Sequence, residues 1–256
     1  MKKNFIIYSI AVLAVLFVAT LGFLIYRYKN LDVFSAPEIS LIPEGSLAVS
    51  PLPSLIVSGG PISDTNPPLK WNEFIVKDKT LSEDYILRIK KDFDDRVTAL
   101  QKDKTLFNHW IVLGNDKKFV GDYEGAKDIY VFVGQLRPLN SLSFENLGDL
   151  YMNFLKDYPN AEIAFKRAVV NVGTENSSYI RNLINLYHFW NKSDLEKQTI
   201  LEAISKFPQE TSFLVLLSRW YSEAGDKANA IIYMQKALNL DPQNQAIQQE
   251  LANLQK

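Results

Sequence analysis

Few residues able to carry out metal or thiol chemistry occur in this chain of 256 residues. It has no cysteine and only two histidines, His109 and His188. Neither histidine has a second histidine four residues along or a pair of carboxylates at metal-ligand spacing. The chain therefore has almost none of the residues that form zinc-type sites, and no cysteine nucleophile. We therefore expect both histidines to pack in the fold or to lie on a binding surface, and we predict no metal and no other cofactor.

Phosphate binding and acid-base catalysis have equally little support. The glycines Gly114, Gly121 and Gly125 fit neither the Walker loop nor the dinucleotide fingerprint, whose backbone amides cradle phosphates. We find no acid-base pair of the kind that a catalytic pocket requires. A net charge of −1 argues against nucleic acid, which normally demands a basic face. These observations predict no enzyme, no small-molecule substrate and no nucleic-acid partner, which leaves binding to another protein.

The elements that would position a binding surface begin at Thr80, where apolar residues start to recur every three or four positions. Thr80 and Glu83 have the spacing of a capping box, in which each side chain satisfies a free backbone amide at the helix start. The polar face mixes charges of both signs, so residues 80–106 are predicted to pack beneath the later helices of the chain rather than on a membrane. The apolar positions are Leu81, Tyr85, Ile89, Phe93, Val97 and Leu100.

A repeat of 34 residues comes after this first helix. Gly114 and Gly148 are 34 residues apart, as are Pro208 and Pro242, and Pro138 precedes Pro208 by 70. The period and the residue types resemble the tetratricopeptide repeat, a helix-turn-helix unit. The resemblance implies an all-α fold, a right-handed superhelix of about four stacked helix pairs that needs a capping helix at its end.

The repeat frame begins at Phe107. Small residues at positions 8, 20 and 27 let neighbouring helices approach closely, and a proline at position 32 ends the second helix. The third unit departs from this pattern with Ile184 at position 8 and Glu196 at position 20, although Ser193 and Glu196 have the spacing of another capping box. We expect the two extra residues of the second unit to lie in turns. The predicted units are 107–140, 141–176, 177–210 and 211–244, with a capping helix at 245–256.

In arrays of this family the first helices line a concave groove, into which positions 2, 5, 9 and 12 point. The resemblance therefore implies a groove for a partner peptide or helix, where asparagine offers donor and acceptor and arginine a two-pronged donor. Asp149 and Glu145 count against capture of a C-terminal carboxylate. For each position the alternative is an ordinary solvated helix face. The implied site residues are Asn108, Ile111, Asn115, Glu145, Asp149, Arg181, Asn185, His188, Val215 and Arg219.

Residues 4–26 contain no charged side chain, and as a helix rising about 1.5 Å per residue they are long enough to span a bilayer. A cleavable signal has a shorter apolar stretch and a small-residue cleavage site, so we predict an uncleaved transmembrane helix after a short basic tail, residues 1–3. Basic residues flank both ends. The Met-Lys-Lys start is typical of exported bacterial chains, which favours a single-pass protein with its soluble part outside the cytoplasm.

Proline dominates the next segment. Seven of the eleven prolines lie between residues 35 and 70, without a helical period. Residues 27–79 are therefore predicted to be a disordered, proline-rich linker that spaces the repeats from the bilayer. The alternative is that Pro51 and Pro53 form a docking peptide for a proline-recognising groove.

A membrane anchor and a groove without catalytic chemistry together predict a membrane-anchored scaffold or adaptor for a protein or peptide partner. Two other classes stay open. The chain could be a chaperone-like accessory of the secretion machinery, since some bacterial proteins with one anchor are similar to translocon accessories; this predicts many weak clients. It could also be a noncatalytic subunit of a complex that acts on cell-envelope polymers, which predicts stable co-purification with a catalytic subunit.

Overall fold

The computed structural model of the chain describes residues 66–172 and 176–256. The chain divides into two compact units, Met1–Ala48 and Val49–Lys256, of which the first lies wholly outside the described residues. The predicted basic tail, transmembrane helix and most of the predicted linker therefore fall outside them too. Among the described helices, none is both long and apolar enough to cross a bilayer.

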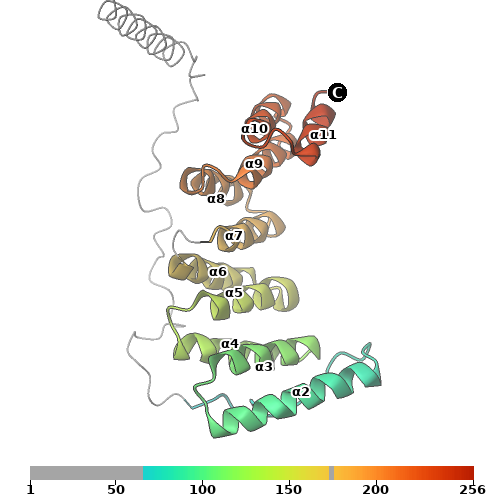
Figure 1. Cartoon of the computed structure of the whole chain (residues 1–256), viewed down its shortest axis with the longest axis vertical. Helices are drawn as coiled ribbons and strands as arrows, with labels where there is room; N and C mark the ends of the chain where they lie inside the picture. The colour runs from blue at the N-terminus through green and yellow to red at the C-terminus, as the bar shows by residue number, and fades with distance from the viewer. Residues whose placement is uncertain (1–65, 173–175) are drawn as a thin grey trace, which may run out of the picture. The chain divides into compact units, whose positions relative to one another are not determined.

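The described part of the chain is entirely helical, without a strand, as the sequence predicts (Figure 1). Ten α-helices and one π-helical turn occur in it. Their bounds are α2 (Glu83–Lys102), α3 (Phe107–Phe119), α4 (Tyr123–Leu136), α5 (Ser141–Asp149), η1 (Leu150–Leu155), α6 (Tyr158–Val172), α7 (Ser178–Phe189), α8 (Ser193–Lys206), α9 (Thr211–Glu223), α10 (Lys227–Leu240) and α11 (Gln245–Leu254).

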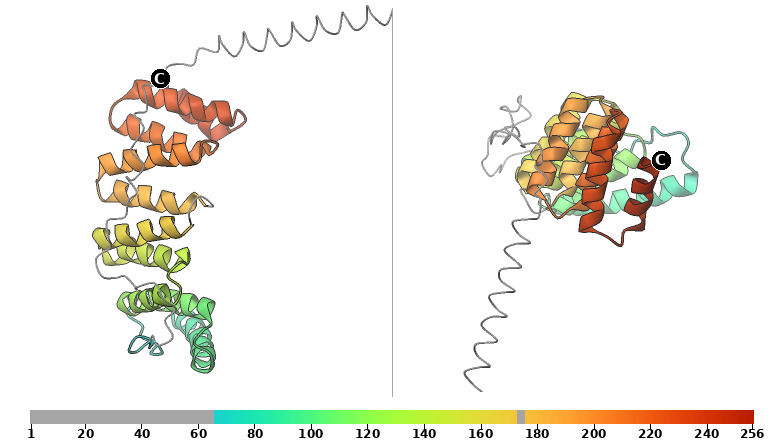
Figure 2. Two further views of the ribbon diagram at one scale, coloured as in Figure 1. Left: turned by 90° about the vertical axis from the view of Figure 1, so that its left-hand side faces the viewer. Right: turned by 90° about the horizontal axis from the view of Figure 1, so that it is seen from above.

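Each helix packs against the next helix along the chain. The first and second helices of a unit pair as α3 with α4, α5 with α6, α7 with α8 and α9 with α10, and each second helix contacts the first helix of the following unit. Helix α2 packs on α3 at one end, and α11 packs on α10 at the other. The left view of Figure 2 shows these layers in chain order, and the right view looks along the stack. Each pair covers its apolar faces only by stacking, as in other repeat proteins.

The start of α2 differs from the predicted capping box. The helix begins at Glu83, and the Ser82 hydroxyl accepts a hydrogen bond from the backbone amide of Tyr85 at 3.4 Å. Thr80 instead donates from its amide and hydroxyl to Asp78 Oδ1, at 2.9 and 2.7 Å. The prediction of Thr80 as the cap is therefore wrong, because a turn closed by Asp78 holds this residue outside the helix.

Residues 68–78, here called the strap, pack on the first helices instead of forming the end of a linker. The Trp71 ring lies 4.9 Å from that of Trp110, and the Phe74 ring lies 5.2 Å from that of Phe93, measured between centroids. Both strap aromatics join the cluster of buried residues shared by α2, α3 and α4. Burial of these rings gives the strap the apolar contacts that a linker lacks, so the predicted linker is wrong for this part of the chain.

A buried lysine on α3 holds the strap through hydrogen bonds. The side chain of Lys117 is 2% exposed, and its ammonium donates to the backbone oxygen of Glu73 at 2.7 Å and to Asp122 Oδ2 at 3.3 Å. The amides of Lys77 and Asp78 donate to the backbone oxygen of Val120 at 2.8 and 3.0 Å. A buried ammonium is tolerated when its donors are satisfied, which this arrangement achieves only with the strap in place.

The extra residue in the first helix of the second unit lies in the π-helical turn η1. A residue with left-handed backbone follows each first helix, and it stands at position 15 in three units but at position 16 in the second. These residues are Gly121 (φ 80°), Lys156 (φ 56°), Asn191 (φ 55°) and Gly225 (φ 80°). We expected this insertion in a turn. That prediction is wrong, because the last turn of the helix widens to absorb it.

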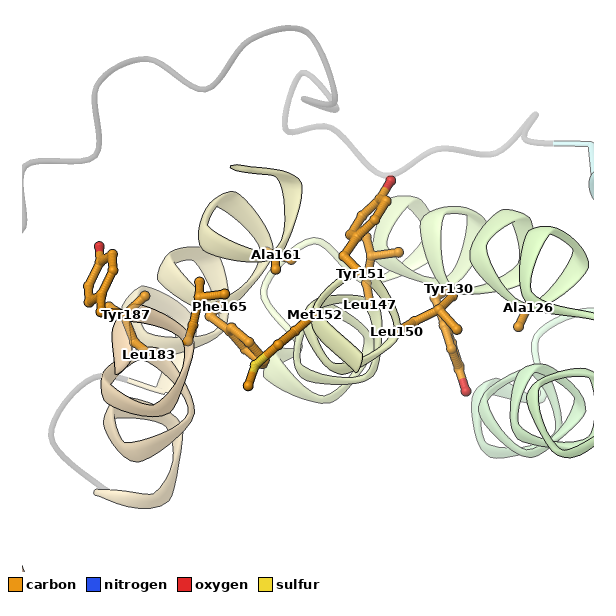
Figure 3. Close-up of a cluster of buried hydrophobic side chains, with 12 residues drawn as sticks. Ala126, Tyr130, Leu147, Leu150, Tyr151, Met152, Ala161, Phe165, Leu183 and Tyr187 are labelled. Atoms are coloured by element: carbon orange, nitrogen blue, oxygen red, sulfur yellow. The ribbon is translucent and has the colours of Figure 1, made fainter. Parts of the chain in front are cut away.

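Glycine at position 8 is explained by an aromatic ring on the second helix. A Cβ atom added at Gly114 would lie 2.5 Å from Cε1 of Tyr130, and one added at Gly148 would lie 2.5 Å from Cδ1 of Phe165. Phe165 and Met152 meet inside the core cluster shared by the first three units (Figure 3). The two helices of these units therefore approach as closely as the repeat pattern predicts.

The third unit solves the same packing problem with different residues. Ile184 replaces the glycine and is 1% exposed, and it shares a buried cluster with Ile200, which stands at the place of the aromatic ring. Two residues of medium size thus occupy the space that glycine and an aromatic ring fill in the first two units. A larger residue at position 8 is thus accompanied by a smaller one at the place of the ring, which accounts for the departure of Ile184 from the repeat pattern.

Candidate partner-binding groove

A hollow of about 330 Å³ lies between the first helices of the second and third units. Glu145, Asp149 and Asn185, all among the predicted groove residues, line it. Asn146, Met152, Asn153, Phe165 and Asn182 complete the lining. Four asparagine amides thus surround a floor made by a methionine and a phenylalanine, which suits a ligand that offers both hydrogen-bonding groups and apolar surface.

The charged residues beside the hollow are already hydrogen-bonded to neighbouring units. Lys118 Nζ on α3 donates to Asp149 Oδ2 at 2.9 Å, which connects the first unit to the second. Asn182 Nδ2 on α7 donates to Glu145 Oε1 at 2.9 Å, which connects the third unit to the second. Both carboxylates therefore hold the array together at the same place where they face the hollow.

The two predicted groove arginines are paired in the same manner. Arg181 donates from Nη1 to Ser212 Oγ at 2.9 Å, and its Nη2 forms an ion pair with Glu210. Arg219 donates from Nε and Nη2 to the two carboxylate oxygens of Glu250 at 2.7 and 2.8 Å. The hydrogen bond from Arg219 holds the pKa of the Glu250 carboxyl below its usual range. Both guanidinium groups are thus already paired with carboxylates of this chain, and their assignment to the groove stays a prediction.

Three predicted groove residues contact the interior. Ile111 is 5% exposed and belongs to the buried cluster around Phe93, so its assignment to the groove is wrong. Val215 is half-buried against the cluster beneath α11. Asn115 is half-buried and accepts a hydrogen bond from the hydroxyl of Tyr130 at 2.5 Å. Position 5 points inward in the first unit because the strap and α2 cover the end of the array there.

Asn108 and His188 remain on the surface. The side chain of His188 is half exposed, and its Nδ1 lies 3.2 Å from Glu196 Oε1. Burial raises the pKa of the Glu196 carboxyl, while the neighbouring His188 acts in the opposite sense. Helix α8 begins at Ser193 without a side-chain cap, so the predicted capping box of Ser193 and Glu196 is wrong. Glu196 reaches across to the first helix instead of turning back on its own backbone.

The lining residues Asn146, Met152, Asn153, Phe165 and Asn182 are absent from the predicted site. A sequence signal for the polar links does exist, because three of them join residues 31 positions apart: Lys118 to Asp149, Arg181 to Ser212 and Arg219 to Glu250. This separation is one repeat less one helical turn, so it brings facing side chains together between successive first helices. A hydrogen-bond donor and an acceptor 31 positions apart in the sequence therefore predict a polar link between neighbouring helices of the array.

The comparisons with known proteins agree with this fold. Residues 211–244 match the model of the tetratricopeptide repeat. None of the curated proteins matches the chain. The crystal structure of MamA has a TM-score of 0.50 and 19% sequence identity, over 63% of this chain and 96% of that chain.

Two other solved structures are similar but score lower. MamA 41-end from Desulfovibrio magneticus RS-1 has a TM-score of 0.46 and 16% identity, over 62% of this chain and 97% of that chain. YrrB, described as a TPR protein with an unusual peptide-binding site, has a TM-score of 0.45 and 18% identity, over 57% of this chain and 75% of that chain.

The described residues therefore form an α-helical array of the tetratricopeptide type. The unit at 211–244 is a tetratricopeptide repeat by sequence as well as by structure, with α9 and α10 as its two helices. The family model thus matches one unit of the array, and the similarity to the MamA structure supports the fold of the described residues.

Proposed function

We propose that the chain is a scaffold that binds a partner peptide or helix in the hollow between α5, η1 and α7. The observation that carries the proposal is the open hollow itself, where asparagine amides meet an apolar floor while the adjacent carboxylates serve as links between units. Such a lining recognises a polypeptide backbone and apolar side chains. We propose no catalytic role, since the hollow holds no base positioned against an acid or nucleophile.

A photo-reactive residue placed in the hollow tests this function. With the substitution Asn185→p-benzoylphenylalanine, irradiation in the native cells is expected to crosslink the chain to one dominant protein. The same residue at Ser205, exposed on the second helix α8, is the matched control and should give no such product. Equal crosslinking at both sites, or none at Asn185, would contradict a groove scaffold, and many weak products at Asn185 would favour a chaperone-like accessory.

We propose further that residues 4–26 anchor the scaffold in a membrane, with the repeats outside the cytoplasm. Support comes from the length of the segment and its lack of charged side chains, together with the basic residues before it. Two reporters fused after Lys256 test the orientation, one active only outside the cytoplasm and one active only inside. Activity of the cytoplasmic reporter alone would contradict the proposed orientation. Recovery of the fusion in the soluble fraction would contradict the proposed membrane anchor.

A further inference from the structure

Three exposed phenylalanines occupy the same structural position in successive repeats. Each stands two residues before the residue with left-handed backbone that follows the first helix of its unit. Other large apolar side chains are exposed in the described part of the chain, but they do not recur at one repeat position. We call Phe119 (54% exposed), Phe154 (39%) and Phe189 (62%) the aromatic stripe.

The stripe continues the face of the first helices that lines the hollow. Phe119 follows Asn115 by four residues, and Phe189 follows Asn185 by four. Residues four apart lie on one face of an α-helix, so these rings extend the row of position-9 side chains toward the helix ends. The stripe therefore lies on the helix face that includes Asn185, which lines the hollow.

The π-turn keeps the second unit in line with the other two. Phe154 follows Asp149 by five residues, and five residues make the closed turn of a π-helix as four do in an α-helix. A regular α-helix would rotate the ring about 100° off this face. The contacts of Lys118 show that Asp149 and Phe154 lie on the same face. Its ammonium lies 2.9 Å from Asp149 Oδ2 and 5.5 Å from the centre of the Phe154 ring.

The fourth unit does not carry the stripe. Glu223 stands at the equivalent position, two residues before Gly225, and Arg219 at position 9 is closed by its two hydrogen bonds to Glu250 on α11. The aromatic stripe is therefore confined to the first three units.

Charge points to an uncharged occupant. The cations on this face each have a carboxylate partner: Lys118 pairs with Asp149 in the second unit, Arg181 with Glu210 at the end of its own unit, and Arg219 with Glu250 in α11. An acidic segment would compete with the carboxylates of these pairs, and a basic segment would compete with their cations. The phenyl rings and the asparagine amides carry no charge, although Asn153 and Asn182 already donate to Asp149 and Glu145.

We infer that the aromatic stripe binds an uncharged, extended polypeptide segment whose large apolar side chains cover the phenylalanines while the asparagines of the hollow hold its backbone. This inference rests on the proposed groove function and specifies its partner. An extended chain advances about 3.3 Å per residue, so side chains that reach rings on successive units must be several residues apart. Amides recognise the backbone in any sequence, so the rings select by apolar side chain and spacing.

The test uses the full chain in detergent micelles and a defined set of synthetic peptides. The peptides are acetylated and amidated, and carry two leucines or phenylalanines separated by two to six residues of glycine, serine and asparagine. Parallel sets carry glutamate or lysine in the spacer, and one acidic set has a free C-terminus. Binding is measured by fluorescence anisotropy for the native chain, for Phe119→Ser/Phe189→Ser, for the bulk-retaining Phe119→Leu/Phe189→Leu, and for Leu139→Ser.

The neutral peptides should bind best. The double serine variant should lower their affinity at least tenfold, because it removes two rings that the bound peptide would cover. The double leucine variant should keep most of the affinity. Leu139 is 80% exposed outside the stripe, so Leu139→Ser is the matched control and should bind like the native chain. Thermal unfolding of each variant confirms that it is folded.

Preference for charged peptides overturns the inference, and so does native-like binding by the double serine variant. Stripe-dependent binding to vesicles of phosphatidylcholine and phosphatidylglycerol, with no peptide bound, would assign the stripe to a membrane and also overturns it. The variant Asn185→Arg, which fills the hollow, separates the two proposals. If it abolishes peptide binding while the serine variant retains it, the groove function stands and the stripe fails; if both variants bind like the native chain, both proposals fail.

Discussion

At the scale of single residues, the close approach of paired helices is set by complementary sizes at two positions of the repeat. Glycine faces an aromatic ring in the first two units, and isoleucine faces isoleucine in the third. A larger residue at the first position is accompanied by a smaller one at the second, because protein interiors tolerate little change in packing. A repeat unit can therefore accept a change at one of these positions when the other changes with it.

This complementarity predicts strong coupling between Gly148 and Phe165. Gly148→Ala places a Cβ 2.5 Å from the Phe165 ring and should lower the free energy of unfolding by about 1–3 kcal/mol. Phe165→Leu alone should cost a similar amount by leaving a cavity. The double variant should lose at least about 1 kcal/mol less than the sum, measured by urea unfolding. Gly148→Ala combined with Ile200→Val, in a different cluster, should be additive; additivity in both pairs would refute the coupling.

The Asp116 carboxyl predicts a pH dependence of stability. Burial raises its pKa from 3.8 to about 6, although Arg96 donates to it at 2.8 Å and acts in the opposite sense. The folded chain therefore holds this proton more tightly than the unfolded chain. Its contribution is complete below about pH 4 and is lost as the pH rises to about 6, up to about 3 kcal/mol in total.

Asp116→Asn removes this titration, so its free energy of unfolding relative to the native chain should increase between pH 4 and pH 6. Urea unfolding at several pH values measures the difference. Asp95→Asn, an exposed carboxylate on α2, is the matched control for loss of one charge and should follow the native profile. If the difference in free energy of unfolding between Asp116→Asn and the native chain stays constant over this pH range, burial does not raise the pKa of the Asp116 carboxyl.

The same scale shows what the sequence could not reveal about the site. Positions that face the groove follow from the repeat frame, and Asn185, Glu145 and Asp149 do line the hollow. Whether a groove arginine is free depends on a partner one repeat away, as with Arg219 and Glu250. That pairing needs the rotation between successive units as well as the period. The inward position of Ile111 depends on the strap, and the strap could not be predicted because it has no repeat pattern.

At the scale of elements, the sequence predicts helices well because their signals are local and periodic. Alanine at position 20, as in Ala126 and Ala230, marks the second helix before any tertiary information. The start of α2 and the π-turn could not be located in the same way. A capping box at Thr80 and a simple N-cap at Ser82 are both compatible with the pattern, and Asp78 decides between them. An extra residue fits either a loop or a widened turn, and packing decides where it goes.

The π-turn gives the prediction that belongs to this scale. Deletion of Asn153 should convert η1 to regular α-helix, keep the left-handed backbone at Lys156 and leave Phe154 on the same face. Since the deletion replaces a rare π-turn by regular α-helix, the thermal midpoint should equal or exceed that of the native chain. Deletion of Ser222 from α9, a first helix without an extra residue, is the control and should lower the midpoint by several degrees. A comparable loss in both deletions would mean that η1 carries no surplus residue.

At the scale of the whole array, stability is a sum of neighbour contacts, and both ends are covered by elements outside the repeats. The strap and α2 cover one end, and α11 covers the other by packing Ile247 and Leu251 against Leu214 and Met234. The polar links between first helices join each unit only to its neighbours. A disturbance should therefore weaken with distance from the unit where it is introduced.

Leu251→Asp tests that decay, because it places a charge at a side chain that is 6% exposed and should detach α11 from α10. Amide hydrogen exchange should accelerate strongly in α9 and α10, less in α7 and α8, and not measurably in α2 to α4, since each unit contacts only its neighbours. Asn253→Asp, exposed on the same helix, is the control for the added charge and should leave exchange unchanged. Uniform acceleration through all helices would contradict stepwise coupling and indicate one cooperative unit. Under stepwise decay the aromatic stripe in units one to three keeps its geometry when the covered end opens, so binding of neutral peptides to the variant should persist.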